Sequence, residues 1–282
     1  MLYGSTHSQQ SVSSSSSSAP PPSPGSPGTP PDVRELAPLL PRPATGSTES
    51  AGAWVHHRVG GWHMVVSNLV LTLATSMLDV VCYAKYSTFS SNQTGNTVIL
   101  ATASLHLRTS PRKCILAATS LLAWLAGALV FGQVRKSRRN TRGWLLASSG
   151  VQMGVLLLYV VLISPAAPGA FGLDGRLEWA AMATCAFQSG IQFVMATGVG
   201  VREINAATVT ASYASLVADP LLFSAAPQQG RDRRVVYLVT FWVGCILGLF
   251  FEQHLGAWIA ALIVAAVKLL SFAIIYRADE AE

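Results

Sequence analysis

The fold is decided by residues 74–107, ATSMLDVVCYAKYSTFSSNQTGNTVILATASLHL. An apolar helix is expected to carry Asp79 near its far end, and a polar break follows it. Residues 94–97, TGNT, then open a second apolar run. This run is too short to cross a bilayer, since a membrane-spanning helix needs about 20 apolar residues. A broken helix beside a buried acid is a recurring way to build a polar site inside a membrane.

The composition indicates a membrane protein. The chain is 51% hydrophobic and only 11% charged, whereas soluble domains carry roughly 25% charged residues. The net charge of +6 does not favour nucleic-acid binding, because the basic residues form short runs beside apolar spans, as the positive-inside rule describes. The cysteines lie in or beside apolar segments with no metal-ligand spacing, so neither a metal site nor a disulfide framework is expected; they are Cys82, Cys114, Cys185 and Cys245.

The N-terminal range 1–63 is expected to be a disordered cytosolic tail. Its Ser- and Pro-rich composition offers too little apolar surface to offset the entropy of ordering. Within it, Glu35, Leu39 and Leu40 resemble an acidic dileucine sorting signal, which would bind a sorting adaptor. A chance match in a linker rich in Leu and Pro is the alternative.

The rest of the chain predicts an all-α polytopic membrane protein. About six transmembrane helices are expected, at 64–84, 114–134, 144–163, 179–200, 235–251 and 256–276. Two shorter segments, 94–107 and 206–223, are expected to re-enter the membrane without crossing it. The basic loop at 135–142 then lies in the cytosol with the N-terminus. If 94–107 crosses instead, seven helices result. A short acidic end, 277–282, follows the transmembrane domain of 64–276.

A shift of 116 residues aligns the two halves of this domain. The first half, 64–163, and the second, 179–276, each contain a long helix, a polar break, a short segment and two more long helices. An odd number of full spans per half requires the second copy to be inverted, a plan that transporters use. Gln152 aligns with Lys268, and Ala128 with Gly244. Small residues on 114–134 and 235–251 predict that these two helices cross each other, or that they form a homodimer interface; chance alignment of small residues is the alternative to a repeat.

Two elements of the first half are candidates for a solute site. Asp79 is an acid within a span, and such residues are usually functional; it suits proton coupling or cation coordination. An interfacial carboxylate paired with Lys85 or Lys268 is the alternative. The break contributes Asn92, and the run 94–97 contributes Thr94, Gly95, Asn96 and Thr97. The N–H groups at the start of this short helix favour an anionic group, unless Thr94 or Asn96 caps them.

The second half supplies polar counterparts. Gln188 and Gln192 are one helical turn apart and share a face. The second break contributes Asn205, Thr210 and Ser212. Lys268 lies in the middle of a span, where it could pair with Asp79 or extend to the interface.

No catalytic signature is found. The sequence contains no nucleophile elbow, zinc-protease, phosphate-loop or dinucleotide-binding motif, so we expect neither an enzyme nor a cofactor.

A resemblance to the YoaK family is carried by Leu78-Asp79, Phe89 and the run 92–98, NQTGNTV. A second element, Arg202 with the run 208–212, TVTAS, is similar to a later motif of that family, with Ala211 where glycine is usual. The resemblance covers about 64–276 and leaves out the tail, as in a fungal-type member. It implies a multispanning membrane protein of a family described only as candidate small-molecule transporters.

We therefore predict a small-solute transporter with a polar site at the broken helices, near Asp79 and Thr94–Thr97. The alternative is a membrane scaffold or regulatory protein that transports nothing and whose polar breaks only pack the bundle. The expected partners are membrane lipid, an unidentified solute, a sorting adaptor and a second copy of the chain. The plasma membrane or a vacuolar or endosomal membrane is the expected location.

Overall fold

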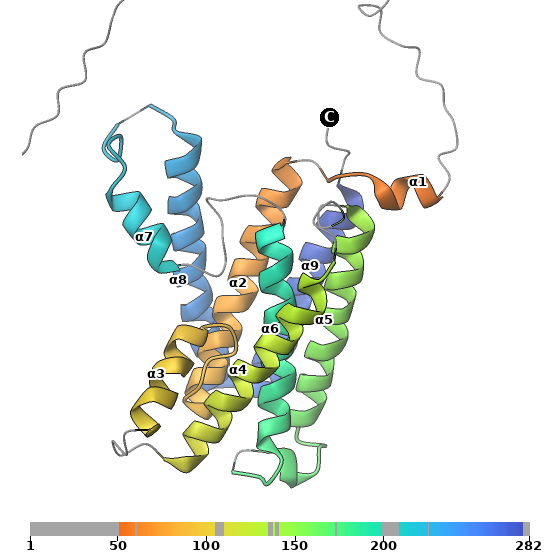
Figure 1. The fold of residues 1–282 in the computed structure, drawn as a ribbon, viewed down its shortest axis with the longest axis vertical. Coiled ribbons are helices and arrows are strands. Elements are labelled where there is room, and N and C mark those ends of the chain that lie inside the picture. Colours follow the sequence, from red (N-terminus) through yellow and green to blue (C-terminus); the bar gives the residue numbers. More distant parts are fainter. Residues whose placement is uncertain are drawn as a thin grey trace, which may run out of the picture. The chain divides into compact units, whose positions relative to one another are not determined.

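The computed structural model describes residues 51–278 except 60, 105–109, 135–137, 139–140, 173, 199–208 and 225. Within these residues the chain is helical, and the only strand-like pairing is an isolated bridge between Arg58 and Thr141. The helices form one bundle (Figure 1).

The helices are α1 (Ala51–His56), α2 (Gly61–Tyr86), α3 (Gln93–Ser104), α4 (Pro111–Gly132), α5 (Arg142–Ile163), α6 (Glu178–Gly198), α7 (Val209–Val217), α8 (Gln229–Leu255) and α9 (Ala257–Arg277), with a 3-10 turn at Gly169–Phe171. Six of them, α2, α4, α5, α6, α8 and α9, correspond to the six predicted long segments. The predicted short segments correspond to α3 and α7. Gly256 joins α8 directly to α9 with a φ of 84°, a backbone conformation that glycine adopts without strain.

Five helices are long and apolar enough to cross a membrane: α2, α4, α5, α8 and α9. The protein is therefore a multi-pass integral membrane protein. The helix α6 is not among the five, and it carries the polar side chains Gln188, Ser189 and Gln192, which lower its hydropathy. It nevertheless packs against α4 and α5 inside the bundle.

The central helix of the bundle is α2, which is the most buried of the five spanning helices. It packs against α8 and α9, while α6 packs against α4 and α5, and α5 also packs against α9. The short helices lie against the bundle, α3 on α4 and α7 on α8 (Figure 1). Large apolar side chains on α4 and α8 remain exposed, as expected of surfaces that face lipid.

Glycines lie at the crossings of α4 with α6 and of α8 with α2. A Cβ on Gly127 of α4 would lie 2.2 Å from the carbonyl oxygen of Phe187 in α6, and one on Gly190 would lie 2.1 Å from that of Trp124. A Cβ on Gly248 of α8 would lie 2.6 Å from the carbonyl oxygen of Met77 in α2. The prediction that α4 and α8 cross each other is wrong. The glycines of α4 pack on α6 and those of α8 pack on α2, so each of the two helices crosses the first long helix of the other half.

The helix α1 lies inside the range 1–63 that the sequence predicts to be a disordered tail. The ring of Trp54 contacts that of Tyr276 edge to face at 5.4 Å, and the guanidinium of Arg142 lies 4.6 Å from the Trp54 ring. The backbone N–H of Arg142 donates to the carbonyl of His57. These contacts join α1 to α5 and α9, and no local sequence pattern predicts them.

Candidate functional site

The loop between α2 and α3 is held by Asp79. Its Oδ1 accepts hydrogen bonds from the backbone N–H groups of Ser90 (3.0 Å) and Ser91 (2.7 Å) and from the hydroxyl of Ser90 (2.7 Å). Its Oδ2 accepts a bond from the hydroxyl of Ser91. Four donors offset part of the cost of burying a carboxylate. The side chain of Asp79 therefore positions the loop, and it also lines the cavity described below.

Asn96 fastens the same loop from the other side. Its Oδ1 accepts from the backbone N–H of Phe89 at 3.1 Å, and its Nδ2 donates to the Phe89 carbonyl at 2.9 Å and to the Ser120 hydroxyl at 3.0 Å. Ser120 of α4 also donates to the Phe89 carbonyl. The hydroxyl of Thr97 donates to the carbonyl of Gln93 within α3. Asn96 and Thr97, both predicted site residues, thus build the turn and do not line the cavity.

The first turn of α3 is capped by Asn92. Its Oδ1 accepts the backbone N–H of Gly95 at 3.3 Å, and its carbonyl accepts that of Asn96 at 3.4 Å. The N–H of Gln93 donates to the carbonyl of Ser91. The capping residue is therefore Asn92 and not Thr94 or Asn96, because the chain enters α3 one residue earlier than the TGN motif suggests.

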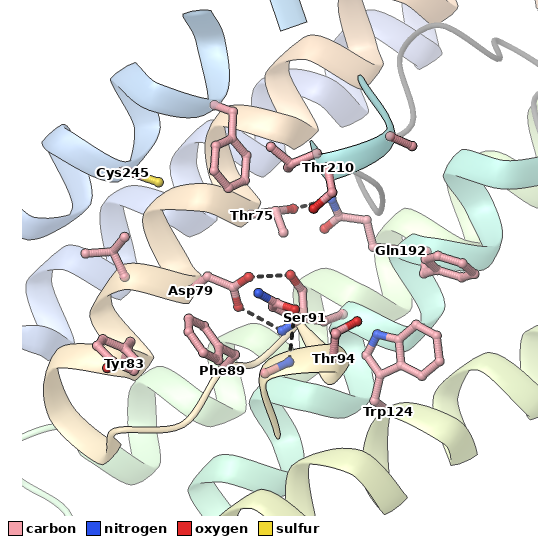
Figure 2. A pocket seen from close by; sticks show the side chains of 18 of the residues that line it. Thr75, Asp79, Tyr83, Phe89, Ser91, Thr94, Trp124, Gln192, Thr210 and Cys245 are labelled. Atoms are coloured by element: carbon pink, nitrogen blue, oxygen red, sulfur yellow. Dashed lines mark hydrogen bonds between the residues drawn. The ribbon is translucent and has the colours of Figure 1, made fainter. Parts of the chain in front are cut away.

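A cavity of ≈ 1000 Å³ lies beside this loop. Its walls come from α2, the loop, α3, α4, α6, α7 and α8 (Figure 2). The lining residues with polar side chains are Thr75, Asp79, Tyr83, Ser91, Asn92, Thr94, Trp124, Ser189, Gln192, Thr210 and Cys245. Both short helices and parts of both halves of the chain thus meet at one space, which is partly open.

Aromatic rings form much of the cavity wall. Tyr83 and Phe89 stack with centroids 4.8 Å apart, and Trp124 meets Phe193 edge to face at 4.9 Å. Phe241 contributes a fifth ring from α8. None of the five was predicted as a site residue, although Phe89 is among the residues that resemble the YoaK family. Aromatic residues in apolar helices face cores and lipid more often than sites.

A smaller cavity of ≈ 430 Å³ adjoins the first. It is lined by Ser110 and Lys113 near the start of α4, and it shares Tyr83, Phe89 and Gly95 with the larger cavity. The stacked pair Tyr83–Phe89 therefore separates the two spaces.

Gln192 joins α6 to α2 at the cavity wall. Its Nε2 donates to the carbonyl of Leu71 at 3.2 Å and to the hydroxyl of Thr75, and Figure 2 shows it facing Thr75 across the upper part of the cavity. Thr75 was also missed; its hydroxyl donates to the carbonyl of Leu71 four residues earlier, a bond usual for threonine in a helix.

Lys268 belongs to a second polar cluster. Its ammonium donates to Oε1 of Gln152 at 3.3 Å and to Oε1 of Gln188, and Gln188 in turn donates to the Ser189 hydroxyl at 2.8 Å. Lys268 is 4% exposed. Its predicted pairing with Asp79 and its predicted extension to the interface are both replaced by this cluster, because amides on α5 and α6 offer nearer acceptors inside the bundle.

Six predicted site residues line the larger cavity: Asp79, Asn92, Thr94, Gly95, Gln192 and Thr210. Five others do not: Asn96, Thr97, Gln188, Ser212 and Lys268. Asn205 and the predicted sorting residues Glu35, Leu39 and Leu40 lie outside the residues that the structure describes.

The fold and cavity define a helical multi-pass membrane protein with a polar and aromatic cavity inside its bundle. The chain belongs to the family described as "Protein of unknown function (DUF1275)", whose model matches residues 68–275. The match begins within α2 and ends within α9. A search of curated proteins and a search of solved structures each returned no match.

Proposed function

We propose that this protein transports a small solute across the membrane and binds it in the cavity beside Asp79 and α3. The observation that carries the proposal is the meeting of both short helices, α3 and α7, at one space of ≈ 1000 Å³ inside a bundle of membrane-spanning helices. Solute pockets in proteins commonly have volumes of about 300–1,000 Å³, so the space suits a small organic molecule.

The proposed architecture has six spans, with α6 as the sixth, in two inverted halves. Three pairs of helix contacts support it, because exchanging the halves converts one member of each pair into the other, whereas the contact of α8 with α9 has no comparable counterpart between the described residues of α4 and α5. The packing of α4 on α6 corresponds to that of α8 on α2, the packing of α5 on α6 to that of α9 on α2, and the packing of α3 on α4 to that of α7 on α8. Short helices in matching positions of two halves are typical of transporters, whose sites lie between the halves near the midplane.

The cavity wall is drawn from both halves. Thr94 and Gly95 come from α3 in the first half, and Thr210 and Ala214 from α7 in the second. A movement of one half against the other would change the wall on both sides, which is the requirement for alternating access. The resemblance of the break sequences to the YoaK family supports the same function.

Filling the cavity tests the proposal. Ala214→Trp places an indole in the cavity from α7, and Val217→Trp is the matched control, since Val217 lies on the same helix, is 74% exposed and does not line the cavity. Each protein is reconstituted into vesicles with a mixture of small metabolites, and the retained compounds are identified by mass spectrometry.

We expect the wild type and Val217→Trp to accumulate a compound that empty vesicles exclude, and Ala214→Trp to lose that uptake. Equal uptake by Ala214→Trp and the wild type would place transport elsewhere. The absence of any protein-dependent uptake from the mixture, with all three proteins folded, would favour a scaffold.

A further inference from the structure

We infer that the cavity takes an organic ammonium ion, an amine that carries an apolar or aryl group. This inference rests on the proposed solute site and names its substrate class. The feature that carries it is the pairing of one carboxylate with five aromatic rings around a single space.

Among the described residues that line the cavity, Asp79 alone has a charged side chain. Its described hydrogen-bond partners are Ser90 and Ser91, which are neutral donors. Asp79 therefore gives the cavity a negative charge. None of its described partners is an ammonium or guanidinium group that would neutralise this charge. Oδ2 accepts one described bond, whereas Oδ1 accepts three, and a carboxylate oxygen has two lone pairs, so Oδ2 has capacity for a further donor.

The rings add attraction for the same kind of ligand. The faces of Trp, Tyr and Phe attract cations within about 6 Å of the ring centre, Trp most strongly. Trp124 of α4, Phe193 of α6 and Phe241 of α8 supply rings from three helices, in addition to the Tyr83–Phe89 stack. An apolar group on the amine would be buried against these rings.

The capping of α3 disfavours the opposite class of ligand. The N–H groups at a helix N-terminus attract anions when they are free. Here the N–H groups of Gln93, Gly95 and Asn96 already donate to acceptors in the loop, and the carboxylate of Asp79 lines the same cavity. An anionic solute would meet repulsion from Asp79 without compensation from α3.

Three probes of similar shape and different charge test the inference: 2-phenylethylammonium, 2-phenylethanol and phenylacetate. The thermal midpoint of the purified protein in detergent is measured against each, since a ligand of the folded state raises the midpoint with occupancy. Titration of the midpoint gives the relative affinities. We expect the ammonium to bind roughly tenfold or more tightly than the alcohol, and phenylacetate to produce no shift.

Two variants test which residues cause the preference for the ammonium over the alcohol. Asp79→Asn keeps an acceptor for the loop N–H groups but removes the charge, so the ammonium should bind no better than the alcohol. Phe241→Leu leaves Asp79 and its loop untouched; it should weaken ammonium binding roughly threefold or more and tests the inference even if Asp79→Asn does not fold. Ala214→Trp should abolish binding of the ammonium, whereas Val217→Trp should not.

An alcohol that binds as tightly as the ammonium, or a preference for phenylacetate, would overturn the ammonium class while leaving a solute site in place. No shift with any probe would overturn the inference for aryl amines. In either case the uptake comparison between Ala214→Trp and Val217→Trp decides the transport proposal separately, because the metabolite mixture does not presuppose a charge.

Discussion

Gln152 and Lys268 are 116 positions apart in the chain, and their side chains are hydrogen-bonded at 3.3 Å inside the bundle. The same separation aligns the two halves of the sequence. Residues at equivalent positions of two halves meet only close to the axis that relates the halves. The contact therefore supports the proposed repeat, in which α5 and α9 would lie at the axis.

The cluster around Lys268 predicts that two substitutions lower the free energy of unfolding by different amounts. Gln188→Leu should lower the free energy of unfolding more than Lys268→Met, because it leaves a buried ammonium with one acceptor fewer, and an unsatisfied buried polar group costs about 1–3 kcal/mol, more when charged. Lys268→Met combined with Gln188→Leu should recover part of the loss. Thermal midpoints in detergent measure all three, and Gln253→Leu, at an exposed position on α8, is the control.

The four hydrogen bonds to Asp79 predict that the loss of stability increases with the number of bonds that a substitution removes. Ser90→Ala removes one of them and should cost about 1 kcal/mol. Asp79→Ala leaves the N–H groups of Ser90 and Ser91 without their acceptor, so it should cost about 2 kcal/mol or more. In Asp79→Ala, the rate of hydrogen exchange should rise more at the amides of Ser90 and Ser91 than at the amides of α9. Unchanged exchange would show that the carboxylate does not hold the loop.

The crossing of α4 and α6 predicts opposite effects for two glycines. Gly190→Ala puts a Cβ 2.1 Å from the carbonyl oxygen of Trp124 and 3.0 Å from the N of Ala128, so α6 must move, and overpacking of this kind costs about 1–3 kcal/mol. Gly154→Ala, in α5, meets nothing within 4 Å and should be neutral or stabilising by up to about 1 kcal/mol. Thermal midpoints that fall equally in both variants would contradict this helix packing.

Cys82 of α2 and Cys185 of α6 are buried with their Sγ atoms 3.3 Å apart. A mild oxidant such as diamide should take two hydrogen atoms from this pair and join the two helices by a disulfide, since little movement separates this contact from a bond of about 2.0 Å. Peptide mass mapping should identify a Cys82–Cys185 link that Cys82→Ser prevents. Links that involve only Cys114 or Cys245 would place α2 and α6 differently.

The long apolar segments could be read from the sequence because a membrane requires about 20 consecutive apolar residues, and each predicted segment corresponds to a long helix. The breaks before α3 and α7 were equally visible, since Ser, Thr, Asn and Gly interrupt the apolar pattern there. The partners of Lys268 and the packing of Gly248 on α2 could not be read from the sequence. Apolar helices carry little periodic signal about which face meets which neighbour.

The sequence by itself determined the class of protein, the positions of the long helices and the acid that lines the cavity, because these follow from hydropathy and from the rarity of charge within spans. Only the tertiary structure decided which polar residues face the cavity. Asp79, Thr94, Gln192 and Thr210 face it, whereas Asn96 binds the loop backbone and Lys268 binds two amides elsewhere. A buried polar group takes the nearest partner that the packed helices offer, and that partner is set by helix crossings between segments far apart in the chain.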